Sequence, residues 1–252
     1  LDRVRIVSVT CAAFNTMAVT DAGELFVAGV NDEGQLLHTS DSPDSCIRSP
    51  MLLEQLGTQR VISVASGNNH TCVLVASQAV LTWGGNEYGQ LGHSPDVHFN
   101  APPRAVRGIG SGHRRVIQVA AGSEHSLFLC VDGSVLACGN GAYGALGVGS
   151  RENRAEAAVV SKLQGVPITH IACGEYHSVA TSKSGFVYAW GRNRYGQLGI
   201  PRTETPHAAY EPLRVPLPLL TQQADCGAMH TMFVSVTGQL WSCGRGTGGQ
   251  LG

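Results

Sequence analysis

The chain has 252 residues, of which 43% are hydrophobic and 14% are charged, and its formal net charge is −1. This composition indicates a globular protein with a sizeable core, and the near-neutral charge argues against a broad surface for nucleic acid or acidic membranes. No stretch approaches the ~20 apolar residues of a membrane span, and the first residues lack the pattern of a secretory signal, so we expect no membrane insertion.

The 32 glycines recur with a regular spacing. One motif reads VAGVNDEGQLL at 27–37, TWGGNEYGQLG at 82–92, ACGNGAYGALG at 137–147, AWGRNRYGQLG at 189–199 and SCGRGTGGQLG at 242–252. A second motif, Gly-x-x-His followed by Ser or Thr, lies at 67–71, 122–126, 174–178 and 227–231, with a degenerate copy at 12–16. Copies of the first motif are 52–55 residues apart, and the histidine precedes the next motif glycine by 14 residues each time, with Asn15 in its place in the first copy. All length variation therefore falls after the first motif, as in a fixed structural unit with one tolerant loop.

Each repeat predicts four strands in chain order. In the second repeat, the first strand is the apolar, β-branched VISVASG at 61–67, the second is HTCVLVA at 70–76 and the third is AVLTWG at 79–84. A glycine between the second and third strands predicts a tight hairpin, and Gln78 replaces that glycine here, so we expect a strained or differently built turn. Fourth strands are predicted at 49–56, 102–109, 157–163 and 211–217, three of them with a proline at the start, which an edge strand tolerates.

Four antiparallel strands in each unit of about 53 residues predict an all-β fold, a β-propeller of four-stranded blades. We expect a single propeller region over 1–252 with repeat units at approximately 1–46, 47–99, 100–155, 156–209 and 210–252. Because the chain ends at the last GQLG segment, the fifth blade is expected to be incomplete.

The compound motif, recurring five times in phase over the whole chain, resembles the regulator of chromosome condensation family. That resemblance implies a propeller of usually seven blades, so about two repeats would lie outside this sequence and the chain would be a fragment of a longer propeller. A nucleotide-binding glycine loop is disfavoured, because none of the copies carries the Lys-Ser/Thr pair that such a loop needs.

Recurring residues have a structural interpretation. The histidines of the second motif fall at equivalent positions of different blades, which would spread them around the ring and would not bring them to one metal ion. We expect each imidazole to satisfy backbone groups at its own turn and the glycines to serve the turns; these residues are His70, His125, His177, His230, Gly84, Gly89, Gly139, Gly191 and Gly196. The sequence predicts neither a metal site nor a cofactor. The eight cysteines occupy small or apolar positions without CxxC spacing, which favours a reduced intracellular location, cytoplasmic or nuclear.

The turns that carry the two motifs are expected on one face of the propeller, because connections in a meander alternate between faces. Within the second motif the two central residues change from copy to copy, and variable side chains on a rigid frame are typical of a recognition surface. The predicted protein-binding rim comprises Phe14, Asn68, Asn69, Glu124, Glu175, Tyr176 and Met229. The alternative is that these residues only form solvated turns.

Two activities implied by the resemblance can be compared with this sequence. The family's exchange factor for the small GTPase Ran takes exchange-critical Asp and His side chains largely from these turns, and a plant ultraviolet-B photoreceptor carries tryptophans there. The second-motif turns of this chain have neither Asp nor Trp. We therefore expect a non-enzymatic protein–protein interaction scaffold, with a guanine-nucleotide exchange factor for a Ran-like GTPase as the alternative.

A short basic cluster is expected on the opposite face, in or beside the connection into the third repeat. It consists of Arg104, Arg107, His113, Arg114 and Arg115. It could contact an acidic protein patch or phosphates, but a solvated loop is the favoured interpretation. One short basic cluster on a nearly neutral protein is weak evidence for contact with nucleic acid or a nucleosome. Such a partner is therefore disfavoured but not excluded.

Overall fold

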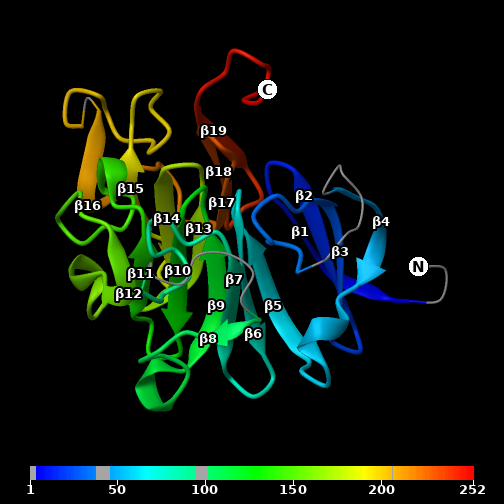
Figure 1. Ribbon diagram of the computed structural model, residues 1–252. Helices are drawn as coiled ribbons and strands as arrows, with labels where there is room; N and C mark the ends of the chain where they lie inside the picture. The colour runs from blue at the N-terminus through cyan, green and yellow to red at the C-terminus, as the bar shows by residue number, and fades with distance from the viewer. Residues whose placement is uncertain (1–3, 38–45, 95–101, 206) are drawn as a thin grey trace.

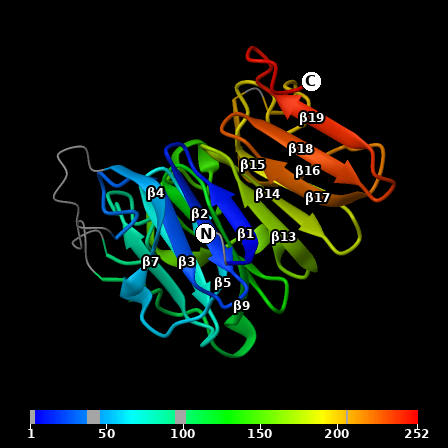
Figure 2. The same cartoon turned by 90° about the vertical axis from the view of Figure 1, so that its right-hand side faces the viewer.

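The computed structural model describes residues 4–37, 46–94, 102–205 and 207–252. Its strands form five sheets that fan out in chain order from the blue first blade to the red fifth blade (Figures 1 and 2). The first blade contains β1 (Ile6–Cys11), β2 (Asn15–Thr20), β3 (Leu25–Val30) and β4 (Cys46–Leu52), and the second contains β5 (Val61–Ser66), β6 (His70–Val75), β7 (Val80–Gly84) and β8 (Arg104–Ala105). The third contains β9 (Val116–Ala121), β10 (His125–Cys130), β11 (Val135–Gly139) and β12 (Arg154–Val159), and the fourth contains β13 (Ile168–Cys173), β14 (His177–Ser182), β15 (Val187–Arg192) and β16 (Ala208–Arg214). The fifth contains β17 (Thr221–Cys226), β18 (His230–Ser235) and β19 (Leu240–Gly244).

The predicted all-β propeller is confirmed. Neighbouring strands within each blade pair antiparallel in chain order, with four strands in the first four blades and three in the fifth. The first strand of each blade packs against the first two strands of the blade before it, as β5 does against β1 and β2. The blades are therefore arranged radially around their first strands.

The constant 14-residue spacing has a direct structural cause. Each motif histidine is paired across the sheet with the first glycine of the following motif, as in His70 with Gly84 and His125 with Gly139. Asn15 is paired with Gly29 in the same way. A change of one residue in this spacing would shift the pairing and move every side chain of the third strand to the opposite face of the sheet.

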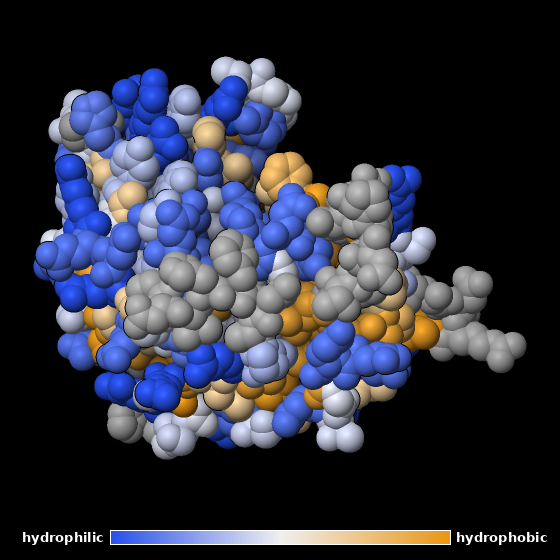
Figure 3. All heavy atoms as spheres, in the orientation of Figure 1, coloured by the Kyte–Doolittle hydropathy of each residue, from blue (hydrophilic) through white to orange (hydrophobic). Residues whose placement is uncertain are grey.

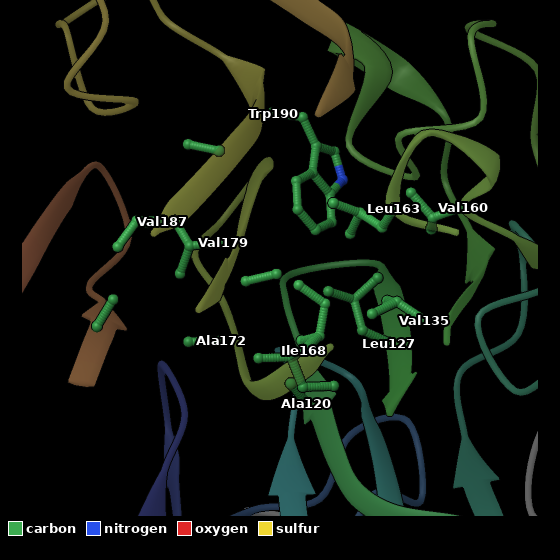
Figure 4. Packing of buried hydrophobic residues seen from close by; sticks show 14 of the residues in the cluster. Ala120, Leu127, Val135, Val160, Leu163, Ile168, Ala172, Val179, Val187 and Trp190 are labelled. Carbon is green, nitrogen blue, oxygen red and sulfur yellow. The ribbon is translucent and has the colours of Figure 1, made fainter. Parts of the chain in front are cut away.

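Burial of the second strands follows from packing between blades. All residues of β6, β10 and β14 are buried because blades cover both faces of these strands. In β18 buried and partly buried residues alternate. Figure 4 shows the core between the third and fourth blades, where the fully buried indole of Trp190 lies beside Leu163. Similar buried clusters fill the spaces between the earlier blades.

The predicted fourth strands are misplaced by about three residues. The observed strands β4, β12 and β16 begin before the predicted starts, and β8 has only two residues. The stretch after β4 forms the 3-10 helix η1 (Glu54–Leu56), and the stretch after β12 forms η4 (Ser161–Leu163); each buries its last leucine. The apolar residues interpreted as a strand therefore belong partly to a helical turn. Leu56 and Leu163, the last residues of these turns, point into the core.

Proline does not begin these strands as expected. Pro50 lies inside β4 and Pro212 lies inside β16. Both fall in stretches where pairing with the neighbouring strand is irregular, between Val27 and Gly29 for the first blade. An irregular edge strand tolerates the missing proline N–H, since no ladder hydrogen bond is lost there.

The hairpin at Gln78 keeps the glycine geometry. Gln78 adopts a φ of 70°, and its N–H donates to the carbonyl of Val75 at 2.8 Å, as that of Gly133 does to Cys130 at 2.9 Å in the next blade. An L-residue in this left-handed conformation costs about 1–2 kcal/mol. The expected strain is therefore present within a turn of the common kind.

We predict that Gln78→Gly raises the free energy of unfolding by about 1 kcal/mol, because glycine removes this strain. Urea unfolding measures the change. The matched control is Gly133→Ala, which should be destabilising, since its φ is 83° and the added Cβ would lie 3.1 Å from the amide nitrogen of Ile168. A loss of stability in Gln78→Gly would contradict the interpretation.

Candidate functional site

Two sets of turns form one rim of the propeller, at the top of Figure 1. We call the segments 12–15, 67–70, 122–125, 174–177 and 227–230 the GxxH turns, and the segments 29–37, 84–92, 139–147, 191–199 and 244–252 the GQLG turns. Within each blade the two are joined, since the amide of Asn140 donates to the carbonyl of Glu124 at 2.8 Å and that of Arg192 to Tyr176 at 2.8 Å. Gly139 makes this approach feasible, because a Cβ there would lie 2.4 Å from the carbonyl oxygen of Glu124.

The GQLG turns are held by their own side chains. In the second blade, Asn86 Oδ1 accepts from the amide of Leu91 at 3.1 Å, and Gln90 Oε1 accepts from the amide of Tyr88 at 3.0 Å. The fourth blade repeats both bonds with the corresponding Asn and Gln. Gly89 closes the turn with a φ of 84° and packs against the next blade, where its Cβ would lie 2.5 Å from the Cα of Ala155. The Asn and Gln side chains of the motif therefore fix the backbone of the turn and are not available to a partner.

The motif histidines join neighbouring blades. Nε2 of His125 lies 2.9 Å from Ser178 Oγ of the next blade, and that hydroxyl donates to the carbonyl of Ala145 at 2.9 Å. The same arrangement links His70 through Ser126 to the second GQLG turn, and His177 through Thr231 to the fourth. We call this histidine, hydroxyl and carbonyl set the blade relay.

The histidine interpretation needs one correction. The predicted partner was the backbone of the same turn, whereas the observed partner is the hydroxyl of the next blade. Sequence spacing could not reveal this, because the contact crosses between repeats. In the first blade Asn15 occupies the histidine position, and its Oδ1 accepts from Ser66 Oγ at 3.4 Å. His230, on the fifth blade, is only partly buried.

Burial determines the protonation of the relay. It lowers the pKa of His70 and His177 from 6.5 to about 3, and that of His125 to about 4. The imidazoles are therefore neutral at pH 7. Because the hydroxyl proton is donated to a carbonyl, Nε2 must carry the imidazole proton and donate to the hydroxyl oxygen. Such a histidine, buried and neutral, has no access to a partner on the surface.

Carbonyls of the GQLG turns receive a second donor from the next blade. The indole Nε1 of Trp190 donates to the carbonyl of Ala145 at 2.8 Å, and that of Trp83 donates to the carbonyl of Gln35 at 2.9 Å, which also accepts from Thr71 Oγ1 at 2.8 Å. Where cysteine replaces tryptophan, Cys138 Sγ lies 3.5 Å from the carbonyl of Gln90. Burial raises the pKa of the Cys138 thiol well above its usual value, so the thiol stays protonated as a weak donor.

The first variable residues of the GxxH turns surround the centre of the rim. Their backbones are linked from blade to blade, as the amide of Ser123 donates to the carbonyl of Glu175 at 3.2 Å and that of Glu175 to Ala228 at 3.0 Å. Together with the ends of the first strands they line a hollow of about 470 Å³. Asn68 donates to Ser123 Oγ at 2.6 Å, whereas Glu175 Oε2 is buried without a hydrogen-bond partner in the described structure.

The second variable residues lie further out, at the junctions between blades. Three residues meet at each junction. One residue immediately precedes the Gly-Gln-Leu segment of a GQLG turn, which is Gly-Ala-Leu in the third repeat. The other two come from the next blade and are the second variable residue of its GxxH turn and the residue after the first glycine of its GQLG turn. These junction triplets are Glu33/Asn69/Gly85, Tyr88/Glu124/Asn140, Tyr143/Tyr176/Arg192 and Tyr195/Met229/Arg245. The structure thus distributes the predicted rim residues along an arc, with Asn68 and Glu175 toward the centre and Phe14, 66% exposed, on the first blade.

Charge changes sign along this arc. Burial and the neighbouring carboxylates of Asp32 and Glu87 raise the pKa of Glu33, and the carboxylate of Glu124 raises the pKa of Tyr88. On the fourth and fifth blades the charged residues of the GQLG turns are positive: Arg192, Arg194 and Arg245. In Figure 3 the upper edge over these blades is mostly hydrophilic.

The sequence analysis missed the residue that immediately precedes the Gly-Gln-Leu segment of the GQLG turn, which is Gly-Ala-Leu in the third repeat. Tyr88, Tyr143 and Tyr195 occupy this position, and the last two are 42% and 36% exposed. The recurrence of tyrosine at one position of a surface turn was a usable signal. The predicted rim contains only variable residues of the GxxH turns, so this position lies outside it.

The residues of the predicted basic cluster lie on β8, on the 3-10 helix η2 (Gly112–Arg114) and in the chain between and after them. Arg104 lies in β8 and, with Arg107, is close enough to His93 for both positive charges to add to the lowering of its pKa, which burial dominates. Arg114 ends η2 and donates to the carbonyl of Gly108 at 3.2 Å. Arg115 is exposed beside it, and the side chain of His113 lies outside the described part of the structure.

Among the described residues, no group of three His, Cys, Asp or Glu side chains is placed to hold a metal ion. The helices in the same part of the chain are too short to cross a bilayer.

Comparison with known proteins places this geometry in a family. The family model for the RCC1-like domain matches residues 1–252. The chain is 33% identical to the ultraviolet-B receptor UVR8 of Arabidopsis thaliana over 255 residues, covering 100% of this chain and 56% of that protein. It is 34% identical to the E3 ubiquitin-protein ligase HERC2 of Homo sapiens over 257 residues, covering 99% of this chain but 5% of the ligase.

Solved structures agree on the fold. Human WBSCR16 superposes with a TM-score of 0.84 at 25% identity, covering 96% of this chain and 63% of that one. Prp20p from Saccharomyces cerevisiae superposes with a TM-score of 0.81 at 23% identity, covering 96% and 58%. The chain thus spans only part of the proteins it resembles.

Proposed function

The chain belongs to the family of RCC1-like domains, and from this premise we propose that it is a protein-docking scaffold without chemistry of its own. The partner binds the rim formed by the GxxH and GQLG turns. One observation carries the proposal: a frame of repeated hydrogen bonds holds junction triplets whose side chains differ from blade to blade. Rigid display of changing side chains is what selective recognition of one partner requires.

The chemistry of the triplets supports an interface. Aromatic, Met and Arg side chains are enriched at protein interfaces, and Phe14, Tyr143, Tyr195 and Met229 add such groups to the rim. Tyr143 also adopts a φ of 58°. Backbone strain of this kind concentrates at functional sites, so it is consistent with a display role.

A guanine-nucleotide exchange factor is the second candidate. Yeast Prp20p, which has the same fold, is described with binding properties to Gsp1p and histones. An exchange factor needs polar groups that reach the nucleotide site of its GTPase. In this chain the histidines of the second to fourth GxxH turns are fully buried in blade relays, which leaves Glu124 and Glu175 as the acidic candidates.

The two candidates differ in one assay. Ran loaded with a fluorescent GDP should release the nucleotide at its spontaneous rate in the presence of the protein, because the scaffold has no group to displace it. Clear acceleration that is lost in Glu124→Gln or Glu175→Gln would overturn the scaffold proposal in favour of exchange.

Docking itself is tested with matched variants on the two faces. We expect a co-purifying partner to be lost from Tyr176→Ala, which removes the centre of a junction triplet, and to be retained by Arg114→Ala on the opposite face. Thermal unfolding should confirm that both variants are folded. Loss of the partner from Arg114→Ala alone would place docking on the other face.

A further inference from the structure

Arginines and tyrosines of the third, fourth and fifth blades form two groups of contacts on the rim, which share the turn that carries Arg192, Arg194 and Tyr195. We call Tyr143, Tyr176, Arg192, Arg194, Tyr195 and Arg245 the arginine–tyrosine patch. Tyr143 and Tyr176 contact each other edge to face with ring centroids 5.5 Å apart, and the guanidinium of Arg192 lies 4.9 Å from the first ring and 6.0 Å from the second. Two junction triplets thus contribute to one surface.

The second half of the patch is centred on Tyr195. The guanidinium of Arg194 lies 5.8 Å from this ring, and that of Arg245, from the next blade, lies 5.7 Å from it. Arg245 is oriented further, because its Nε donates to Thr247 Oγ1 at 2.8 Å and its Nη1 contacts Met229 Sδ at 3.7 Å. Cation–π contacts in this range position an arginine while leaving guanidinium N–H groups to bind another group.

The three arginines have no acidic partner within the described part of the chain. Ion pairs there include Arg154 with Glu152 at 3.2 Å and Lys162 with Glu211 at 3.7 Å, and none involves the patch. Arg194 and Arg245 both contact the Tyr195 ring, and their like charges repel one another unless an anion binds between them. The planar guanidinium group of an arginine can donate two parallel hydrogen bonds to one carboxylate in a bidentate contact.

The surroundings restrict which anion fits. Burial is the main reason that the pKa of Tyr176 is raised, and the carboxylates of Glu124 and Glu175 add to it, which places negative charge beside the patch. The rim continues to Glu87 and Glu33 on the earlier blades. A long polyanion such as a nucleic acid would extend along the rim and be repelled by these carboxylates. A short acidic segment of a protein could instead contact the arginines without reaching the carboxylates of the earlier blades.

We infer that the arginine–tyrosine patch binds an acidic, Asp/Glu-containing segment of the docked protein through carboxylate–guanidinium hydrogen bonds. This inference rests on the proposed scaffold function and adds the chemistry of the partner to it. The tyrosine rings keep the arginines in place and supply apolar contact to the backbone of the bound segment.

Fluorescence anisotropy with defined probes tests the inference. The probe is a labelled dodecapeptide of alternating Asp and Glu, and its counterpart of alternating Asn and Gln is the control. We expect the acidic peptide to bind at least about ten-fold more tightly at low salt and to weaken as salt is added. Equal binding of the amide peptide, or tighter binding of a dodecathymidine oligonucleotide, would overturn the inference.

Variants assign the binding to the patch. Arg192→Gln and Arg245→Gln should each weaken the acidic peptide by about five-fold, and Arg192→Lys should fall between wild type and Arg192→Gln, because it keeps the charge but loses the planar fork. Arg115→Gln, an exposed arginine on the opposite face, is the matched control and should leave binding unchanged. An equal loss in Arg115→Gln would show nonspecific attraction and would contradict the assignment.

Partner capture separates failure of this inference from failure of the scaffold proposal. If Asn69→Ala and Phe14→Ala abolish capture while Arg192→Gln and Arg245→Gln retain it, the rim docks its partner but the patch does not bind it. If none of these variants changes capture, both proposals are wrong. Capture that is lost with the arginines, together with the peptide result, supports both.

Discussion

Acidification from pH 6.5 to pH 5 is expected to lower the free energy of unfolding by about 5 kcal/mol through three buried histidines. The folded protein holds His70, His125 and His177 neutral, with pKa values of about 3, 4 and 3 in place of 6.5. The unfolded chain binds protons on these groups as the pH falls through 6.5. Their contribution is therefore complete above this pH and is lost as the pH falls toward the folded-state values.

The slope of this dependence is itself a measurement. Below about pH 5.5 three protons are taken up on unfolding, so stability should change by about 4 kcal/mol per pH unit. A loss of this size is comparable with the whole stability of many domains. Urea unfolding at a series of pH values between 7 and 5 measures it, and this window lies above the usual pKa range of carboxylates.

The variant His125→Asn removes one of the three histidines that cause this pH dependence. Asparagine occupies the same position naturally in the first blade, where Asn15 accepts a hydrogen bond from Ser66. The variant should be less stable at pH 7, because Ser178 loses the imidazole donor, but its pH slope should be shallower by about 1.4 kcal/mol per unit. Burial also lowers the pKa of His93 and His170, which contribute in the same direction in both proteins. An unchanged slope would mean that His125 is already charged in the folded state.

Trp190→Ala is expected to lower the free energy of unfolding by about 3–5 kcal/mol. The indole is fully buried between the third and fourth blades and donates to the carbonyl of Ala145. Gly147 leaves room for it, since a Cβ at that position would lie 2.8 Å from the indole nitrogen. Removing the ring leaves a cavity at a blade interface and removes one of the two donors to that carbonyl.

Two controls divide this effect into packing and hydrogen bonding. Trp190→Phe keeps most of the apolar volume and should cost about 1–2 kcal/mol, because Ser178 still donates to the carbonyl of Ala145. Trp241→Ala makes the same chemical change at a ring that is 40% exposed, and should cost clearly less. Equal losses in Trp190→Ala and Trp241→Ala would show that burial between blades is not the cause.

The residues at the centre of the junction triplets of the proposed docking rim were open to identification from the sequence. Asn69, Glu124, Tyr176 and Met229 were identified because they vary at a fixed position of a repeated turn. Their junction partners, such as Tyr143 and Arg192, were not identified, because each contact joins the GQLG turn of one repeat to the turns of the next. The change from carboxylates to arginines along the arc becomes visible only when those contacts are known.

The repeat period by itself determined the blade, its first three strands and the faces on which its turns emerge, because strand register is local and the spacing of 14 residues pairs His125 with Gly139. The tertiary structure alone decided what joins one blade to the next. Nε2 of His125 binds Ser178, and the carbonyl of Ala145 accepts from that hydroxyl and from Trp190. Ser178 and Trp190 belong to the fourth blade, whereas His125 and Ala145 belong to the third. Because these contacts cross from one repeat to the next, no periodicity within a repeat contains them. Burial supplies the physical reason that they are paired, since each of these polar groups would otherwise be left without a partner away from water.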